Sequence, residues 1–88
     1  MILFRDALGV HLRSRRLSLG RTLRDVSADA QVSLGYLSEI ERGQKEASSE
    51  LLGAICLALN VDLSEVLACL AHDVAMAERG RVEVVRAA

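Results

Sequence analysis

The chain has 88 residues, of which 51% are hydrophobic, 26% charged and 2% aromatic, with six Gly, two Cys and no Pro, and this composition favours one helical domain with a thin core over disorder. No apolar run approaches the roughly 20 residues of a membrane span, Arg5 and Asp6 make residues 1–12 a poor signal peptide, and two Cys are too few for a secreted disulfide scaffold, so we expect a cytoplasmic protein. The net charge of −1 divides into +3 over residues 1–45 (eight basic, five acidic) and −4 over residues 46–88 (three basic, seven acidic), which hints at one face for a polyanion.

The N-terminal third of the chain contains two predicted helices. Apolar residues at helical spacing predict the first over residues 2–19, and Gly20 is a typical residue just past a helix C-terminus. Thr22 can cap a second helix that ends near Ala30, and Asp25 in its first turn suits the helix dipole.

Two further helices follow after short turns. Ser33 is the expected N-cap of the third helix, and Gly43 is its expected end. Ser48 or Ser49 opens the fourth helix, which stops near Asn60.

A fifth helix is predicted after Asp62 or Ser64, with a possible continuation through Arg79 to a stop at Gly80. Residues 81–88 alternate weakly as a strand would, and a frayed tail fits them equally well. We therefore predict an all-α fold of about five helices, with one domain over residues 1–70 and a C-terminal helical extension or tail over residues 71–88.

The second and third helices form the most informative stretch, because only Gln31 and Val32 separate them. Helices this short bury little surface as a hairpin, but they can form a helix-turn-helix, in which the first helix braces the second in a groove. Leu37 and Ile40 must then face inward. Small residues at the start of the third helix let its free N–H groups approach a phosphate or a base edge.

These segments carry a resemblance to a known family. TLRDVS, VSLGYLSEIERG and ASSELLGAICLALNVDLSEVL resemble the Cro/phage-repressor (XRE) type of bacterial helix-turn-helix regulators, over residues 3–70. Within that family, VSLGYLSEIERGQKEASSELLGAICLAL is especially similar to actinobacterial regulators of Clp protease genes. The resemblance implies a five-helix, lambda-repressor-like DNA-binding domain that works as a dimer on palindromic operators.

The resemblance places the recognition helix at Ser33–Arg42. Its base-facing positions fall on Ser33, Leu34, Gly35, Ser38 and Glu39. Leu34 and Gly35 depart from the amide side chains of many relatives, so hydrogen-bonding readout is thin and rests on the two serines and on Glu39 facing a cytosine amine. Some specificity is then expected from DNA shape or from arginines outside this helix.

Other residues near these helices are expected to contact the DNA backbone. Tyr36 is either a phosphate ligand through its hydroxyl or a half-buried wedge. For each of the remaining residues the alternative is a solvated surface side chain. The predicted phosphate contacts are Arg21, Thr22, Arg24, Arg42, Gln44 and Lys45.

Arg16 and Glu41 fall where the family commonly has a partly buried ion pair between the first helix and the recognition helix. An acid near a DNA-facing helix end repels phosphate unless a cation neutralises it. We therefore expect a structural role for both residues rather than a DNA contact.

Neither a metal site nor a catalytic site is predicted. His11 and His72 lie far apart and lack the usual zinc-ligand spacing to Cys56 and Cys69, and the two cysteines are expected to act as small core hydrophobes. No phosphate-binding Gly-rich loop, nucleophile elbow or carboxylate pair occurs in the sequence. We expect no enzyme activity, no cofactor and no small-molecule ligand.

The C-terminal half suggests two protein partners. Its apolar stripe exceeds what a small helix buries in a monomer and predicts a homodimer interface, formed by Leu63, Val66, Leu67, Leu70 and Val74. The alternative is that the stripe packs on the core of its own chain. The terminal Ala87 and Ala88 resemble the ends by which some Clp substrates are recognised, although two terminal alanines also arise by chance.

Taken together, these features predict a dimeric transcription regulator that binds double-stranded DNA on the bacterial nucleoid and activates Clp protease and proteostasis genes. The resemblance, not the residues, suggests activation. Two alternatives stay open. One is an antitoxin or phage-type repressor, which a neighbouring toxin gene would indicate. The other is a helical protein-interaction module with no DNA function, and the steep salt dependence of true phosphate binding would separate DNA binding from it.

Overall fold

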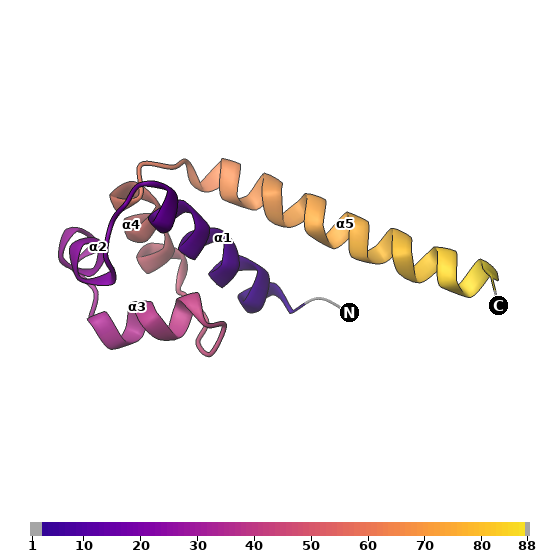
Figure 1. The fold of residues 1–88 in the computed structure, drawn as a ribbon, viewed down its shortest axis with the longest axis horizontal. Coiled ribbons are helices and arrows are strands. Elements are labelled where there is room, and N and C mark those ends of the chain that lie inside the picture. Colours follow the sequence, from indigo (N-terminus) through magenta and orange to yellow (C-terminus); the bar gives the residue numbers. More distant parts are fainter. Residues whose placement is uncertain (1–2, 88) are drawn as a thin grey trace.

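The computed structural model describes residues 3–87, with the side chains described through residue 80. It confirms the predicted five-helix, all-α fold, and no strand occurs between residues 3 and 87 (Figure 1). The helices are α1 (Phe4–Ser18), α2 (Leu23–Ala30), α3 (Leu34–Glu41), α4 (Ser49–Ala58) and α5 (Leu63–Ala87).

Serine and threonine caps start the three middle helices. The hydroxyls of Thr22, Ser33 and Ser48 accept hydrogen bonds from backbone N–H groups in the first turns of α2, α3 and α4. The backbone N–H of Thr22 in turn donates to the Asp25 carboxylate, which completes a capping box. The hydrogen bonds from the backbone and hydroxyl of Thr22 lower the pKa of Asp25, so this contribution to stability is present above the ordinary aspartate pKa and is lost in stronger acid.

The core lies where α1 to α4 meet the first turns of α5. Its largest fully buried side chains come from all five helices, which makes residues 3–70 one packed unit. They are Leu12, Val26, Leu37, Ile40, Ile55, Leu59 and Leu70. Among the described residues, no single helix is long and apolar enough to cross a membrane. Only α4 together with residues 63–80 of α5 reaches that length and composition, with a bend of 107° between them.

Helix α5 is longer than the sequence predicted. It runs past Gly80 to Ala87 and projects from the rounded head formed by the other helices, so the chain measures 50 × 23 × 22 Å (Figure 1). The predicted stop at Gly80, and the strand or frayed tail predicted for residues 81–87, are therefore wrong. A glycine inside a helix costs only about 1 kcal/mol relative to alanine, and the good helix formers at 75–79 and at Arg81 offset it. Ala88 lies outside the described residues.

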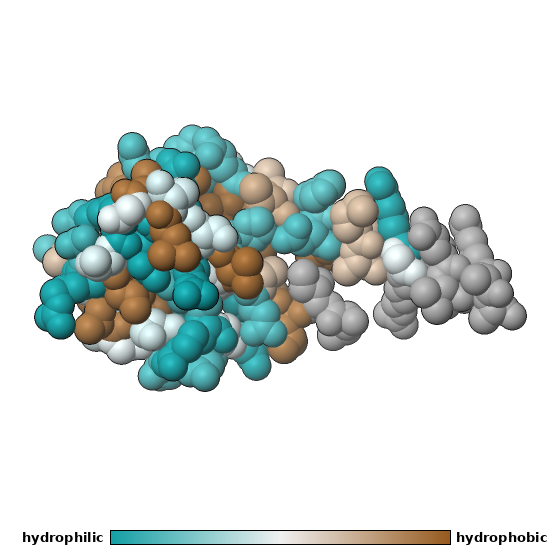
Figure 2. Space-filling model, viewed as in Figure 1, coloured by the Kyte–Doolittle hydropathy of each residue, from teal (hydrophilic) through white to brown (hydrophobic). Residues whose placement is uncertain are grey.

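The predicted apolar stripe on α5 divides between core and surface. Val66 is 6% exposed and Leu70 is 2% exposed, so both belong to the core of their own chain and the expectation that they line a dimer interface needs correction. Leu63 is also half-buried against this core. Leu67, at 46% exposed, remains on the surface and Val74 is half-buried. Along the projecting part of α5, apolar and hydrophilic residues both reach the surface (Figure 2).

The two cysteines behave differently. Cys56 is buried in the core as predicted, and its burial raises the pKa of the thiol. Cys69 lies on the surface of α5, so the prediction that it fills the core is wrong. Helical spacing puts Cys69 one position before the buried Leu70, which turns its side chain away from the core.

Candidate nucleic-acid interface

The turn between α2 and α3 is tight and locally determined. Gln31 closes α2 in the left-handed conformation with φ 57°, a conformation that non-glycine residues adopt mainly in single capping positions. Ser33 then caps α3 two residues later. On α3, Leu37 and Ile40 are each only 1% exposed and anchor the helix to the core. The opposite face of α3 is thereby directed outward.

The leading end of this outward face is small and open. Ser33, Leu34 and Gly35 are exposed, and a Cβ added at Gly35 would meet no atom within 4 Å. Farther along the helix, Ser38 and Glu39 are half-buried rather than fully outward. Of the five predicted base-facing residues, the N-terminal three are thus the most accessible.

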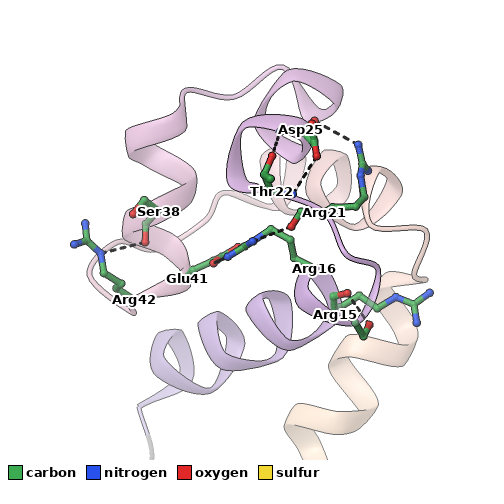
Figure 3. Close-up of polar contacts among 9 residues, drawn as sticks. Arg15, Arg16, Arg21, Thr22, Asp25, Ser38, Glu41 and Arg42 are labelled. Carbon is green, nitrogen blue, oxygen red and sulfur yellow. Dashed lines mark hydrogen bonds and ion pairs between the residues drawn. The ribbon is translucent and has the colours of Figure 1, made fainter.

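A buried ion pair joins α1 to the C-terminal end of α3. Arg16 donates from Nε to Oε2 of Glu41 at 2.7 Å and from Nη2 to Oε1 at 2.9 Å, and the two side chains lie end to end between the helices (Figure 3). A third bond runs from Arg16 Nη1 to the carbonyl of Arg21 at 2.9 Å. The hydrogen bond to Glu41 raises the pKa of Arg16. The predicted pair is therefore present, in the two-pronged geometry that makes such pairs strong.

Two backbone contacts that the sequence reasoning missed also fix the end of α3. A Cβ added at Gly9 of α1 would lie 2.5 Å from the carbonyl oxygen of Ile40 and 2.6 Å from that of Glu41, so only glycine lets the two helices pack this closely. Arg5 donates from Nε to the carbonyl of Gly43 at 2.9 Å. A glycine in the middle of an apolar helix is the sequence signal for such a close approach.

Arg21 does not stand free as a phosphate ligand. Its guanidinium bonds to the carbonyl of Ala58 at 2.6 Å, to the carbonyl of Asp25 and to the carboxylate of Asp29. Arg15 bonds similarly to the carbonyls of Leu59 and Asn60. Both arginines satisfy the carbonyl end of α4, where a cation is favoured, so the prediction that Arg21 contacts DNA needs correction.

The other side chains predicted to contact the DNA backbone lie on the protein surface. Thr22, Arg24, Arg42, Gln44 and Lys45 are all exposed. Arg42 donates from Nε to the carbonyl of Ser38 at 3.4 Å, and Lys45 Nζ lies 3.7 Å from the Glu39 carboxylate.

Of the two interpretations of Tyr36, the structure favours the half-buried wedge over the phosphate ligand. Its ring is half-buried against the core, and its hydroxyl donates to the carbonyl of Glu46 at 3.2 Å. The tyrosine therefore braces the loop after α3.

Within the described residues, the histidines and cysteines do not form a metal-binding cluster. His11 Nε2 lies 2.7 Å from Asp73 Oδ2 and ties α1 to α5. Within residues 3–80, no group of three or more His, Cys, Asp or Glu side chains is placed to hold a metal ion.

Comparison with known proteins identifies this arrangement. The helix-turn-helix family HTH_3 matches residues 12–66, a range that spans α2, the turn, α3 and α4. The transcriptional regulator ClgR of Mycobacterium tuberculosis is 60% identical over 77 residues, which cover 88% of this chain and 69% of ClgR. The chain belongs to the helix-turn-helix family of transcriptional regulators.

Solved structures agree with the assignment to this family. The crystal structure of the clp gene regulator ClgR from Corynebacterium glutamicum matches 81% of this chain and 91% of that chain, with a TM-score of 0.76 and 51% identity. The restriction-modification controller protein C.AhdI from Aeromonas hydrophila, at 22% identity and a TM-score of 0.69, shares the fold. This chain is thus an XRE-type DNA-binding regulator related to ClgR, and its family is one of regulators rather than enzymes.

In a helix-turn-helix protein the second helix of the motif enters the major groove. Here that helix is α3, whose outward face is set by Leu37 and Ile40 and whose far end is held by Arg16 and Gly9. Family membership and local geometry therefore select the same face of the molecule as the candidate interface.

Proposed function

We propose that this chain is a sequence-specific regulator that acts as a dimer and places α3 of each subunit in a major groove of a palindromic operator. The outward face of α3 carries this proposal, because its open, small-residue leading end suits close approach to base edges. With half-sites one helical turn apart, roughly 34 Å separates the two α3 helices on the DNA.

The proposed DNA contacts are of two kinds, contacts with base edges and contacts with phosphates. Base edges are read by Ser33, Leu34, Gly35, Ser38 and Glu39, with Leu34 against a thymine methyl group. Phosphates are held by Thr22, Arg24, Arg42, Gln44 and Lys45, all of them exposed. Arg21 is left out because its guanidinium is bonded within the chain, to Ala58 of α4 and to Asp25 and Asp29 of α2. Arg16 and Glu41 hold α3 in place and do not touch the DNA.

The Gly35→Glu variant tests the role of α3. Its new side chain enters open space and adds a negative charge to the face that meets phosphate and base acceptors. We expect affinity for a specific duplex to fall about a hundredfold, because like charges brought together at an interface cost several kcal/mol. The melting temperature should not fall, since glutamate is a better helix former than glycine.

Gly53→Glu is the matched control, because Gly53 on α4 also has no atom within 4 Å of an added Cβ. Fluorescence anisotropy with a labelled duplex measures both variants against the parent chain. Equal affinities for Gly35→Glu and Gly53→Glu would remove α3 from the interface.

We assign the dimer contact to the apolar residues of α5 that reach the protein surface. Leu67 and Met76 are 46% and 50% exposed, Val74 is half-buried, and the helix projects beyond the core that it completes. Sedimentation equilibrium at micromolar concentration should give twice the 9.5 kDa mass of the chain. A species of 9.5 kDa alone would contradict the dimer.

The regulated genes are proposed from the relatives. ClgR is named the clp gene regulator, so we propose that this chain activates genes of Clp protease and proteostasis, in the cytoplasm and on the nucleoid. We also propose that Ala87 and Ala88 mark the chain for Clp protease. Equal half-lives of the parent chain and an Ala87→Asp, Ala88→Asp variant in a Clp degradation assay would contradict that role.

A further inference from the structure

A cleft of about 430 Å³ lies where α1, the start of α2 and the C-terminal half of α3 meet. It adjoins the candidate interface, because Ser38 of the outward face of α3 is one of its walls. Its lining consists of Arg13, Arg16, Leu23, Ser38, Glu41 and Arg42. Figure 3 shows Ser38 and Arg42 on the outer side of α3, next to the ion pair.

The charge in this cleft is unbalanced. Its floor is neutral, because Glu41 takes two donors of Arg16 and the carbonyl of Arg21 takes a third. The two remaining arginines, Arg13 and Arg42, are exposed. Among the described residues Arg13 has no hydrogen bond or ion pair, and Arg42 has only the long bond to the Ser38 carbonyl. Two positive charges therefore border a cleft that holds no acid to match them.

We propose that this cleft holds one phosphodiester group of duplex DNA, between Arg13 of α1 and Arg42 at the end of α3. The inference rests on the proposed function and extends the interface to α1. When α3 lies in the major groove, the phosphates that flank the groove pass its sides, and the cleft opens on one of them. Two guanidinium groups can then share the oxygens of one phosphate.

In this arrangement Arg13 orients the protein on the DNA. A phosphate contact carries no sequence information, but it fixes the register and angle of the protein on the duplex. With little hydrogen-bonding readout on α3, a contact from a second helix fixes how Ser38 meets the bases. The neutral floor matters as well, because an unpaired Glu41 would repel the same phosphate.

The experiment measures the affinity of Arg13→Gln at several salt concentrations, using a labelled duplex of the sequence that the parent protein enriches from a randomised pool. We expect affinity at near-physiological salt to fall about tenfold. The slope of log affinity against log salt should shrink by about 1 per half-site, because each phosphate contact contributes about 0.9. Arg13→Lys should keep most of the slope, and the enriched sequence should not change.

Ser64→Asp is the matched control, because it also lowers the net charge by one, at an exposed position on α5 away from the cleft. Parental slope and affinity in Arg13→Gln, or equal losses in Ser64→Asp, would overturn the inference. Failure of the parent protein to enrich any duplex would instead overturn the proposed function. Inorganic phosphate at matched ionic strength separates the two sources of phosphate. An Arg13-dependent rise in melting temperature, with an unchanged DNA slope, would assign the cleft to a free anion and contradict a DNA contact.

Discussion

Replacing Arg16 with alanine is expected to lower the free energy of unfolding by about 3–5 kcal/mol, because one partner of a buried ion pair is removed while the other stays. The Glu41 side chain is only 5% exposed, and two of the three bonds of Arg16 end on its carboxylate. For a domain of this size the melting temperature should fall by at least about 12 °C. Circular dichroism measures both the melting curve and chemical unfolding.

Two further variants separate the effect of breaking the ion pair from the effect of removing any arginine. Arg13→Ala removes an exposed arginine from the same helix and should change stability by less than about 0.5 kcal/mol. The double variant Arg16→Met, Glu41→Leu replaces the whole pair with apolar groups and should recover most of the stability. An unchanged melting curve for Arg16→Ala would show that the pair does not hold α3, whatever happened to DNA binding.

The Gly9→Ala variant should lose about 2 kcal/mol, although alanine is the better helix former. Its methyl group would lie 2.5 Å and 2.6 Å from two carbonyl oxygens of the α3 backbone, which no side-chain rotation can relieve. Overpacking of this kind costs about 1–3 kcal/mol, and α1 must move away from α3 to relieve it. We therefore expect weaker DNA binding as well, because the end of α3 shifts.

Gly53→Ala provides the comparison within the same chain. The added methyl group on α4 enters open space, so the variant should gain about 0.5–1 kcal/mol from helix propensity. Thermal melts of the two alanine variants and anisotropy with a specific duplex separate packing from propensity. A gain in stability for both variants would mean that α1 and α3 are not in close contact at Gly9.

The local architecture of the head could be predicted from the sequence because short-range chemistry determines it. Thr22, Ser33 and Ser48 cap the helices that they precede, and Gly20 and Gly43 adopt the positive φ values that end helices, 67° and 72°. Each of these features depends on residues within a few positions of one another. The Arg16–Glu41 pair spans 25 residues and was predicted only through the family resemblance.

The features that sequence reasoning missed depend on tertiary contacts. Nothing in the local pattern distinguishes Arg21, whose guanidinium is bonded within the chain, from Arg24, which is exposed. The division of the α5 stripe into buried Leu70 and exposed Leu67 depends on where the head ends. The sequence predicts a stop at Gly80, but a glycine inside a helix costs only about 1 kcal/mol, and the good helix formers at 75–79 and at Arg81 outweigh that cost.

Enrichment from a randomised duplex pool at near-physiological salt shows whether a symmetric dimer reads base sequence through α3. Purified protein retains duplexes, and the retained sequences are read. We expect an enriched inverted repeat with half-sites about one helical turn apart, which the parent chain and Gly53→Glu enrich and Gly35→Glu does not. Retention without any enriched sequence, disappearing as salt rises, would contradict it, because the protein would then bind phosphate without reading bases through α3.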